Sequence, residues 1–121
     1  MTTIEMLEKI LKDINNIGGV EACVVASRDG LLICSTMPKK QHAETFAAMS
    51  ATMIGAAETA TTELGKGITD RIIVESKHGT IIGTGAGSKA LLLVMTQPGA
   101  GLGLVLIETT KASEQIKQVL G

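Results

Sequence analysis

Apolar residues recur along this chain at two different spacings, and the change between the spacings marks the structural elements. Over residues 4–17 and 102–120, apolar side chains return every three or four positions, as they do on one face of a helix. Over residues 20–36 and 69–96, short runs rich in Val, Ile and Leu are bounded by turn-forming residues, as strands are. The pattern predicts a helix near each end of the chain and strands between them.

A third helical stretch interrupts the strands, and it completes the predicted order. The expected elements are helix 2–17, strands 20–27 and 31–36, helix 41–64, strands 69–76, 80–84 and 90–96, and helix 102–120. Strands joined by short turns pair antiparallel, and here helices do not alternate with every strand, so the fold class is α+β with a five-stranded antiparallel sheet. The 121 residues suit one domain, which we expect to span residues 1–121.

The first two strands are joined by Asp29-Gly30, a dipeptide typical of a type I′ turn, in which both central residues have positive φ. That turn sets Val25 opposite Cys34, with Cys23 one diagonal step away on the same face. Diagonal neighbours are about 7–8 Å apart at Cα, which exceeds the usual span of a disulfide. Two reduced structural thiols are therefore favoured over a redox pair.

The central helix carries no charged residue between Glu44 and Glu58. A helix at a protein surface normally shows a charged stripe to water, so we expect something other than water to cover part of it. One face carries the larger apolar residues and is predicted to pack on the core, namely Phe46, Met49, Met53, Ala57, Ala60 and Leu64.

The opposite side, here called the small-residue face, consists of Ala48, Ala51, Thr52, Gly55 and Thr59. Small side chains let two helix backbones approach closely, and a mid-helix glycine costs about 1 kcal/mol relative to alanine, so a packing role for it is plausible. We expect this face to be buried between protomers or against a partner. The alternative is an Ala/Thr surface that simply meets water.

Composition narrows the classes of function. The chain has a single aromatic residue, Phe46, a net charge of -1 and a pI near 6.1. Proteins that bind nucleic acid need basic surfaces or aromatic stacking platforms, so no nucleic-acid partner is expected. The first twelve residues are charged and amphipathic, unlike a signal peptide, and no run of 18 apolar residues is present. We therefore expect a cytoplasmic protein without a transmembrane segment.

Two glycine-rich stretches partly match nucleotide-binding loops. Residues 83–89 read Gly-Thr-Gly-Ala-Gly-Ser-Lys, but they lack the Gly-Lys-Ser/Thr of a P-loop and lead into a strand, so a hairpin turn is favoured. Residues 99–103 precede a helix, but Leu104 occupies the place of the last glycine of the dinucleotide motif. We expect no cofactor at either stretch.

No residues assemble a recognisable catalytic or metal site. His42 and His78 are far apart, and neither has a cysteine or carboxylate constellation around it, so no metal ligand is assigned. No serine lies in a nucleophile elbow. The absence of catalytic residues favours a binding or scaffolding protein over an enzyme.

Three stretches in the same order resemble the Roadblock/dynein-light-chain family, in its bare-domain prokaryotic or archaeal form. They are the hairpin of residues 19–33, the alanine-rich run 47–51 and the closing stretch 102–108. The resemblance covers essentially the whole chain. It implies a five-stranded antiparallel sheet with the first and last helices on one face and the central helix on the other.

The resemblance also implies a function. Members of the family regulate or scaffold small Ras-like GTPases or act as adaptors on motor complexes, and they dimerise through the third strand and the central helices. Here that strand is residues 69–76, with Ile72 and Val74 as interface candidates. We therefore expect a non-enzymatic homodimeric module that binds a small GTPase or a related signalling or motor partner. The alternative is a small-molecule, nucleotide-like sensor with a pocket near residues 99–103.

Overall fold

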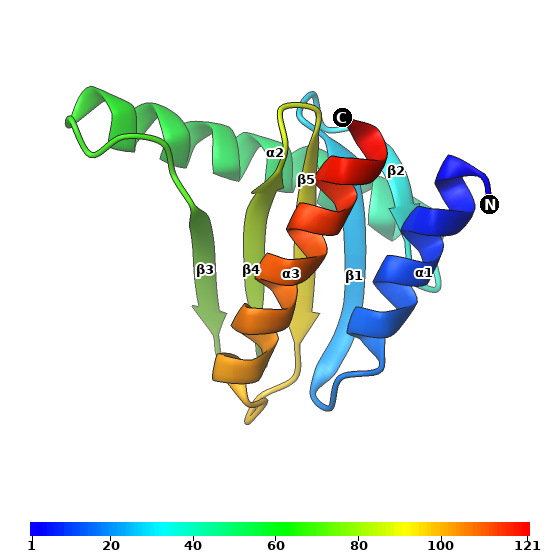
Figure 1. The fold of residues 1–121 in the computed structure, drawn as a ribbon. Helices are drawn as coiled ribbons and strands as arrows, with labels where there is room; N and C mark the ends of the chain where they lie inside the picture. Colours follow the sequence, from blue (N-terminus) through cyan, green and yellow to red (C-terminus); the bar gives the residue numbers. More distant parts are fainter.

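A computed structural model describes all 121 residues. Its elements are α1 (Thr3–Asn15), β1 (Val20–Ser27), β2 (Leu32–Ser35), α2 (Lys40–Glu63), β3 (Arg71–Ser76), β4 (Gly79–Ala86), β5 (Ala90–Thr96) and α3 (Leu102–Leu120). The strands form one antiparallel five-stranded sheet in the order β2-β1-β5-β4-β3 (Figure 1). The predicted fold class and element order are confirmed, and β1 and β5 have the predicted bounds.

The sheet separates two hydrophobic cores. α1 and α3 lie together on one face of the sheet and α2 lies on the other (Figure 1). Because successive residues of a strand point to opposite faces, Leu92 and Val94 of β5 join the core under α1 and α3, whereas Leu91 and Leu93 join the core under α2. The layer arrangement implied by the family resemblance is therefore confirmed.

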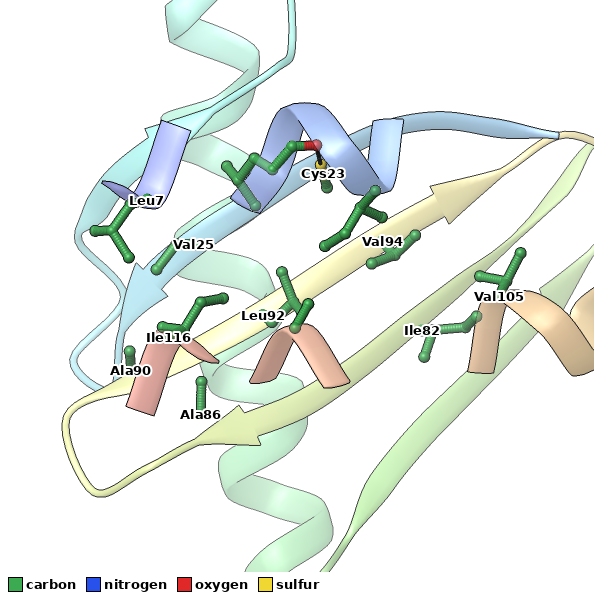
Figure 2. Close-up of a cluster of buried hydrophobic side chains, with 13 residues drawn as sticks. Leu7, Cys23, Val25, Ile82, Ala86, Ala90, Leu92, Val94, Val105 and Ile116 are labelled. Atoms are coloured by element: carbon green, nitrogen blue, oxygen red, sulfur yellow. Dashed lines mark hydrogen bonds between the residues drawn. The ribbon is translucent and has the colours of Figure 1, made fainter. Parts of the chain in front are cut away.

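The larger core is aliphatic and contains 13 buried residues. In Figure 2, Leu7 of α1 and Ile116 of α3 lie over β1 and β5, and Val105 lies near Ile82 of β4. A capping box holds the start of α1, because the Glu5 N–H donates to Thr2 Oγ1 at 3.1 Å and the Thr2 N–H donates to Glu5 Oε1 at 3.2 Å. A cap of this kind contributes about 1 kcal/mol.

α2 packs on the sheet through its small residues, which corrects the predicted core face. Met49 is 64% exposed and Leu64 is 75% exposed, although both were assigned to the core. The buried residues of α2 are Ala43, Ala47, Ser50 and Ile54. Successive residues of a helix are about 100° apart around its axis. The buried face is therefore turned by roughly 80° about the helix axis from the predicted face. The sheet supplies the bulk in this layer, with Leu91 and Leu93 fully covered, so the helix contributes mostly small side chains.

The turn between β1 and β2 is one residue longer than predicted. Only Gly30 has positive φ, at +90°, so Asp29-Gly30 is not a type I′ turn and that prediction is wrong. The Ser27 N–H donates to Leu31 O at 2.8 Å and closes a three-residue loop over residues 28–30. Three-residue loops of this kind place a glycine at the left-handed position, which is where Gly30 lies.

A register shift between β1 and β2 restores the predicted pairing beyond this loop. Val25 lies opposite Cys34, as predicted, while Ala26 lies opposite Leu32, so Ile33 of β2 is the extra residue of a β-bulge. An extra residue in the bulge compensates for the extra residue in the loop. In the next hairpin, Ser76 pairs with Gly79, so the turn between β3 and β4 is Lys77-His78 and β4 begins one residue before the predicted strand 80–84.

We predict that Gly83→Val destabilises the protein by about 1–3 kcal/mol, as overpacked core substitutions do. A Cβ at Gly83 would lie 3.0 Å from side-chain atoms of Ile54, Ile72 and Leu93, so α2 cannot keep its distance from the sheet. Urea unfolding measures the effect. Gly18→Ala is the control, because a Cβ there meets nothing within 4 Å, and its effect should stay within about 0.5 kcal/mol. Equal stabilities for both variants would contradict the prediction.

Candidate interaction surface

α2 is longer than the sheet is wide. Its 24 residues extend about 36 Å, whereas five strands span roughly 19 Å at their usual spacing. Figure 1 shows the C-terminal turns of α2 extending past β3, which forms one edge of the sheet. Leu64 and Ile68, just beyond the helix, are 75% and 82% exposed. This projecting part of α2 and the loop after it are here called the overhang.

The small-residue face points mostly away from the sheet. Ala48, Thr52, Gly55 and Thr59 are exposed and Ala51 is half-buried. The Thr52 hydroxyl donates to Ala48 O at 3.1 Å and the Thr59 hydroxyl donates to Gly55 O at 3.0 Å. Because these hydroxyls are satisfied within the helix, the face presents methyl groups and backbone to its surroundings.

Part of this face has a role within the chain. A Cβ at Gly30 would lie 3.1 Å from Ala48 Cα and 3.4 Å from Ala51 Cβ, so the β1–β2 loop packs closely against α2 there. Small side chains at positions 48 and 51 therefore fit the protein's own hairpin. Gly55 differs, because a Cβ there would meet nothing within 4 Å.

β3 offers a second exposed surface. It pairs only with β4, so its outer edge has no partner strand. Ile72 and Val74 lie on the α2 side and are half-buried, whereas Ile73 lies on the α1 and α3 side and is 43% exposed. An edge strand with an apolar centre and no proline is a template for pairing with another strand.

An ion pair ties α2 to the ends of the strands. Arg28, in the β1–β2 loop, contacts Glu58 of α2 at 2.8 Å and donates to Gly87 O of the β4–β5 turn, also at 2.8 Å. A Cβ at Gly85 would collide with the Arg28 guanidinium, so this glycine leaves room for the arginine. Sequence reasoning missed this contact, because the two charged residues are 30 positions apart and no motif joins them.

The surface hollows do not coincide with the glycine-rich segment that the sensor alternative requires. The largest of four hollows, of about 600 Å³, lies between β3, β4 and α3 and includes Arg28, Arg71 and Lys117 in its lining. None of the four is lined by a residue of 99–103. His42 lies on α2 and His78 in the β3–β4 turn, both exposed, and no group of three potential metal ligands is present.

Comparison with known proteins identifies the family. A family model described as the Roadblock/LC7 domain matches residues 6–96. The chain belongs to the Roadblock/LC7 domain family. The uncharacterised protein MJ1340 of Methanocaldococcus jannaschii is 34% identical over 112 residues, which are 93% of this chain and 97% of that protein.

Solved structures confirm the fold of this Roadblock/LC7 chain. MglB in a tetrameric arrangement has a TM-score of 0.90 at 20% identity, covering 98% of this chain and 90% of that chain. A Roadblock/LC7 domain from Streptomyces avermitilis has a TM-score of 0.86 at 17% identity, covering 99% and 98%. None of the helices here combines the length and the apolar character needed to cross a bilayer.

The two cysteines of this Roadblock/LC7 chain are free. Cys23 is buried, and its thiol donates to Leu11 O of α1 at 3.2 Å. Burial raises the pKa of Cys23 to about 11, against a smaller lowering by its hydrogen bond with Thr36. Burial also raises the pKa of Cys34 to about 12, helped by the nearby Glu8 carboxylate and by Cys23.

We predict that both thiols react slowly in the folded protein. Because the thiolate is the nucleophile and both pKa values lie well above 8, alkylation by iodoacetamide at pH 8 should be at least about a hundredfold slower than for an exposed thiol of ordinary pKa. Timed quenching and mass spectrometry measure the rates. The same protein in guanidinium chloride is the control and should react at the ordinary rate. Equal rates in the folded and unfolded protein would refute the prediction.

Proposed function

We propose that this protein is a non-enzymatic regulatory or scaffold module that forms a homodimer through β3 and binds a small Ras-like GTPase on the small-residue face of α2. The observation that carries the proposal is the exposed, uncharged side of α2. No charged residue lies between Glu44 and Glu58, yet Ala48, Thr52 and Gly55 are exposed there. Contiguous exposed apolar surface marks sites of protein–protein contact.

Family membership supports the kind of partner. The Roadblock/LC7 family match covers residues 6–96, and the resemblance found in the sequence implies Ras-like GTPases or related signalling and motor proteins as partners. A cytoplasmic location follows from the same proposal, because such GTPases act there. The free edge of β3, with Ile72 and Val74, supports the homodimer. MglB, which shares the fold, is known in a tetrameric arrangement.

Gly55→Glu tests the partner surface without threatening the fold. A side chain at position 55 meets nothing within 4 Å, and glutamate is a better helix former than glycine by about 0.5–1 kcal/mol, so the thermal midpoint should stay equal or rise. A buried, unpaired carboxylate at the contact should weaken partner binding by at least about tenfold. The measurement is affinity capture from native lysate, loaded with GDP or with a slowly hydrolysed GTP analogue, followed by mass spectrometry.

Gln118→Glu is the matched control, because it adds the same charge at an exposed position of α3. We expect the wild type and this control to retain a small GTPase and Gly55→Glu to lose it. Retention in one nucleotide state indicates regulation, and retention in both indicates a scaffold. If Gly55→Glu retains the GTPase as well as the control does, α2 is not the contact. If the wild type captures no GTPase in either state, the proposed partner is wrong.

A further inference from the structure

The glycine-rich turn between β4 and β5 makes room for two cationic side chains. A Cβ at Gly85 would collide with the guanidinium of Arg28, and a Cβ at Gly87 would lie 3.0 Å from Cγ of Lys117. Arg28 comes from the β1–β2 loop and Lys117 from the last turn of α3, so three segments that are distant in the sequence meet at this turn (Figure 1). Two glycines of the hairpin therefore allow two positive charges to lie against it.

The same turn has backbone donors that are not used within the chain. The N–H groups of Gly87 and Ser88 make no hydrogen bond with another group of the protein. Successive backbone N–H groups in a turn can bind an anion, and Arg28 and Lys117 lie beside them. The turn thus combines the two kinds of donor that proteins use to bind phosphate groups, namely backbone N–H groups and cationic side chains.

Both cations keep free donors. Lys117 takes part in neither of the two ion pairs of the structure. The carbonyl end of α3, where a cation is favourable, is contacted by Lys89, whose Nζ donates to Leu120 O at 3.2 Å. Arg28 uses two N–H groups for its contacts with α2 and the β4–β5 turn, whereas a guanidinium carries five. Donors of both side chains therefore remain available to a ligand.

The turn lines the largest surface hollow, which has a volume of about 600 Å³, within the usual range of small-molecule sites. Asp70 and Glu114 line the same hollow farther from the turn. Glu114 lies three residues before Lys117, about 4.5 Å along the axis of α3, and Asp70 O accepts from the hydroxyl of Thr84, within β4, at 3.0 Å. Because carboxylates only accept hydrogen bonds, this part of the hollow suits hydroxyl groups of a ligand.

We propose that this hollow binds a small phosphorylated molecule that bears hydroxyl groups, of the sugar phosphate class. The phosphate lies at the β4–β5 turn, between the two cations and the two free N–H groups, and the hydroxyl groups lie toward the two carboxylates. The hollow is lined by no aromatic side chain, so a nucleobase would find no stacking partner there. The site does not depend on the proposed GTPase contact, because it lies between β3, β4 and α3, on the side of the sheet opposite to α2.

NMR can locate binding at the turn. The probe is glucose 1-phosphate, whose blocked anomeric carbon does not react with lysine. In a titration of ¹⁵N-labelled protein, the amide signals of Gly87 and Ser88 should shift and saturate with a Kd of about 1 mM or tighter. Methyl glucoside, which lacks the phosphate, should leave these signals in place. Inorganic phosphate at matched ionic strength should bind at least about tenfold more weakly, because it makes no contact with the carboxylates.

Lys117→Gln tests the contribution of the cation. The change removes the charge and keeps most of the side chain, so the Kd for glucose 1-phosphate should rise at least about tenfold. Lys111→Gln is the matched control, because it removes the same charge from the same helix, but Lys111 pairs with Glu108 and does not line the hollow. Its Kd should stay within about twofold of the wild type. Circular dichroism establishes that both variants are folded, as expected at exposed positions.

The inference is overturned if the signals of Gly87 and Ser88 stay in place with glucose 1-phosphate up to about 20 mM. Equal weakening by Lys111→Gln and Lys117→Gln also overturns it, because binding would then depend on net charge alone. If inorganic phosphate binds as tightly as glucose 1-phosphate, the hydroxyl contacts are absent and the sugar phosphate assignment is wrong. None of these results bears on the capture of a GTPase by α2, so the two proposals fail separately.

Discussion

The close approach of α2 to the sheet is the constraint on which the rest of this structure depends. The side of α2 that faces the sheet carries the fully buried residues Ala43, Ala47 and Ser50. Their small side chains let the backbone of α2 lie near β1 and β5. The residues facing α2 match this, because Gly83 of β4 leaves room for Ile54 and Gly30 of the β1–β2 loop leaves room for Ala48. Close packing of this kind tolerates little change in side-chain volume. The orientation of α2 is therefore fixed by residues with small side chains.

This orientation determines what the molecule presents to others. Because small residues occupy the inner side of α2, the larger Met49 on the helix and Leu64 just after it are mostly exposed. The same layer ends at β3, whose outer edge is unpaired. The molecule therefore presents an uncharged helix surface, which arises from the packing of α2, and an open strand edge, which arises from the strand order of the sheet.

The local pattern of the sequence was enough to predict the elements and the fold class. The predicted pairing of Val25 with Cys34 is present only because a β-bulge compensates for the longer loop. The local pattern failed where the answer depended on distant residues. The periodicity of α2 was read with large residues inward, whereas the sheet already fills the core with Leu91 and Leu93. Asp29-Gly30 predicted a turn at the correct place but of the wrong type, because one glycine at positive φ also suits a three-residue loop.

For the candidate surface, the sequence predicted the uncharged stretch of the central helix. The family resemblance implied a role for the third strand, which stays a prediction. The sequence could not show that α2 outreaches the sheet, that Gly30 packs on Ala48 and Ala51, or that Arg28 reaches Glu58. These contacts join segments that are remote along the chain, and they depend on how far one layer is displaced over another. Only the assembled structure contains that information.

The Arg28–Glu58 contact has one further consequence. A slip of α2 along its axis by one turn would move Glu58 by about 5.4 Å, which would separate it from Arg28 and from the loop that positions the arginine. The ion pair thus favours the observed position of α2 along its axis, in addition to the close packing of the buried residues of α2 on the sheet. This position is built into the single chain before any partner arrives, so association does not have to immobilise the helix, and less conformational entropy is lost on binding.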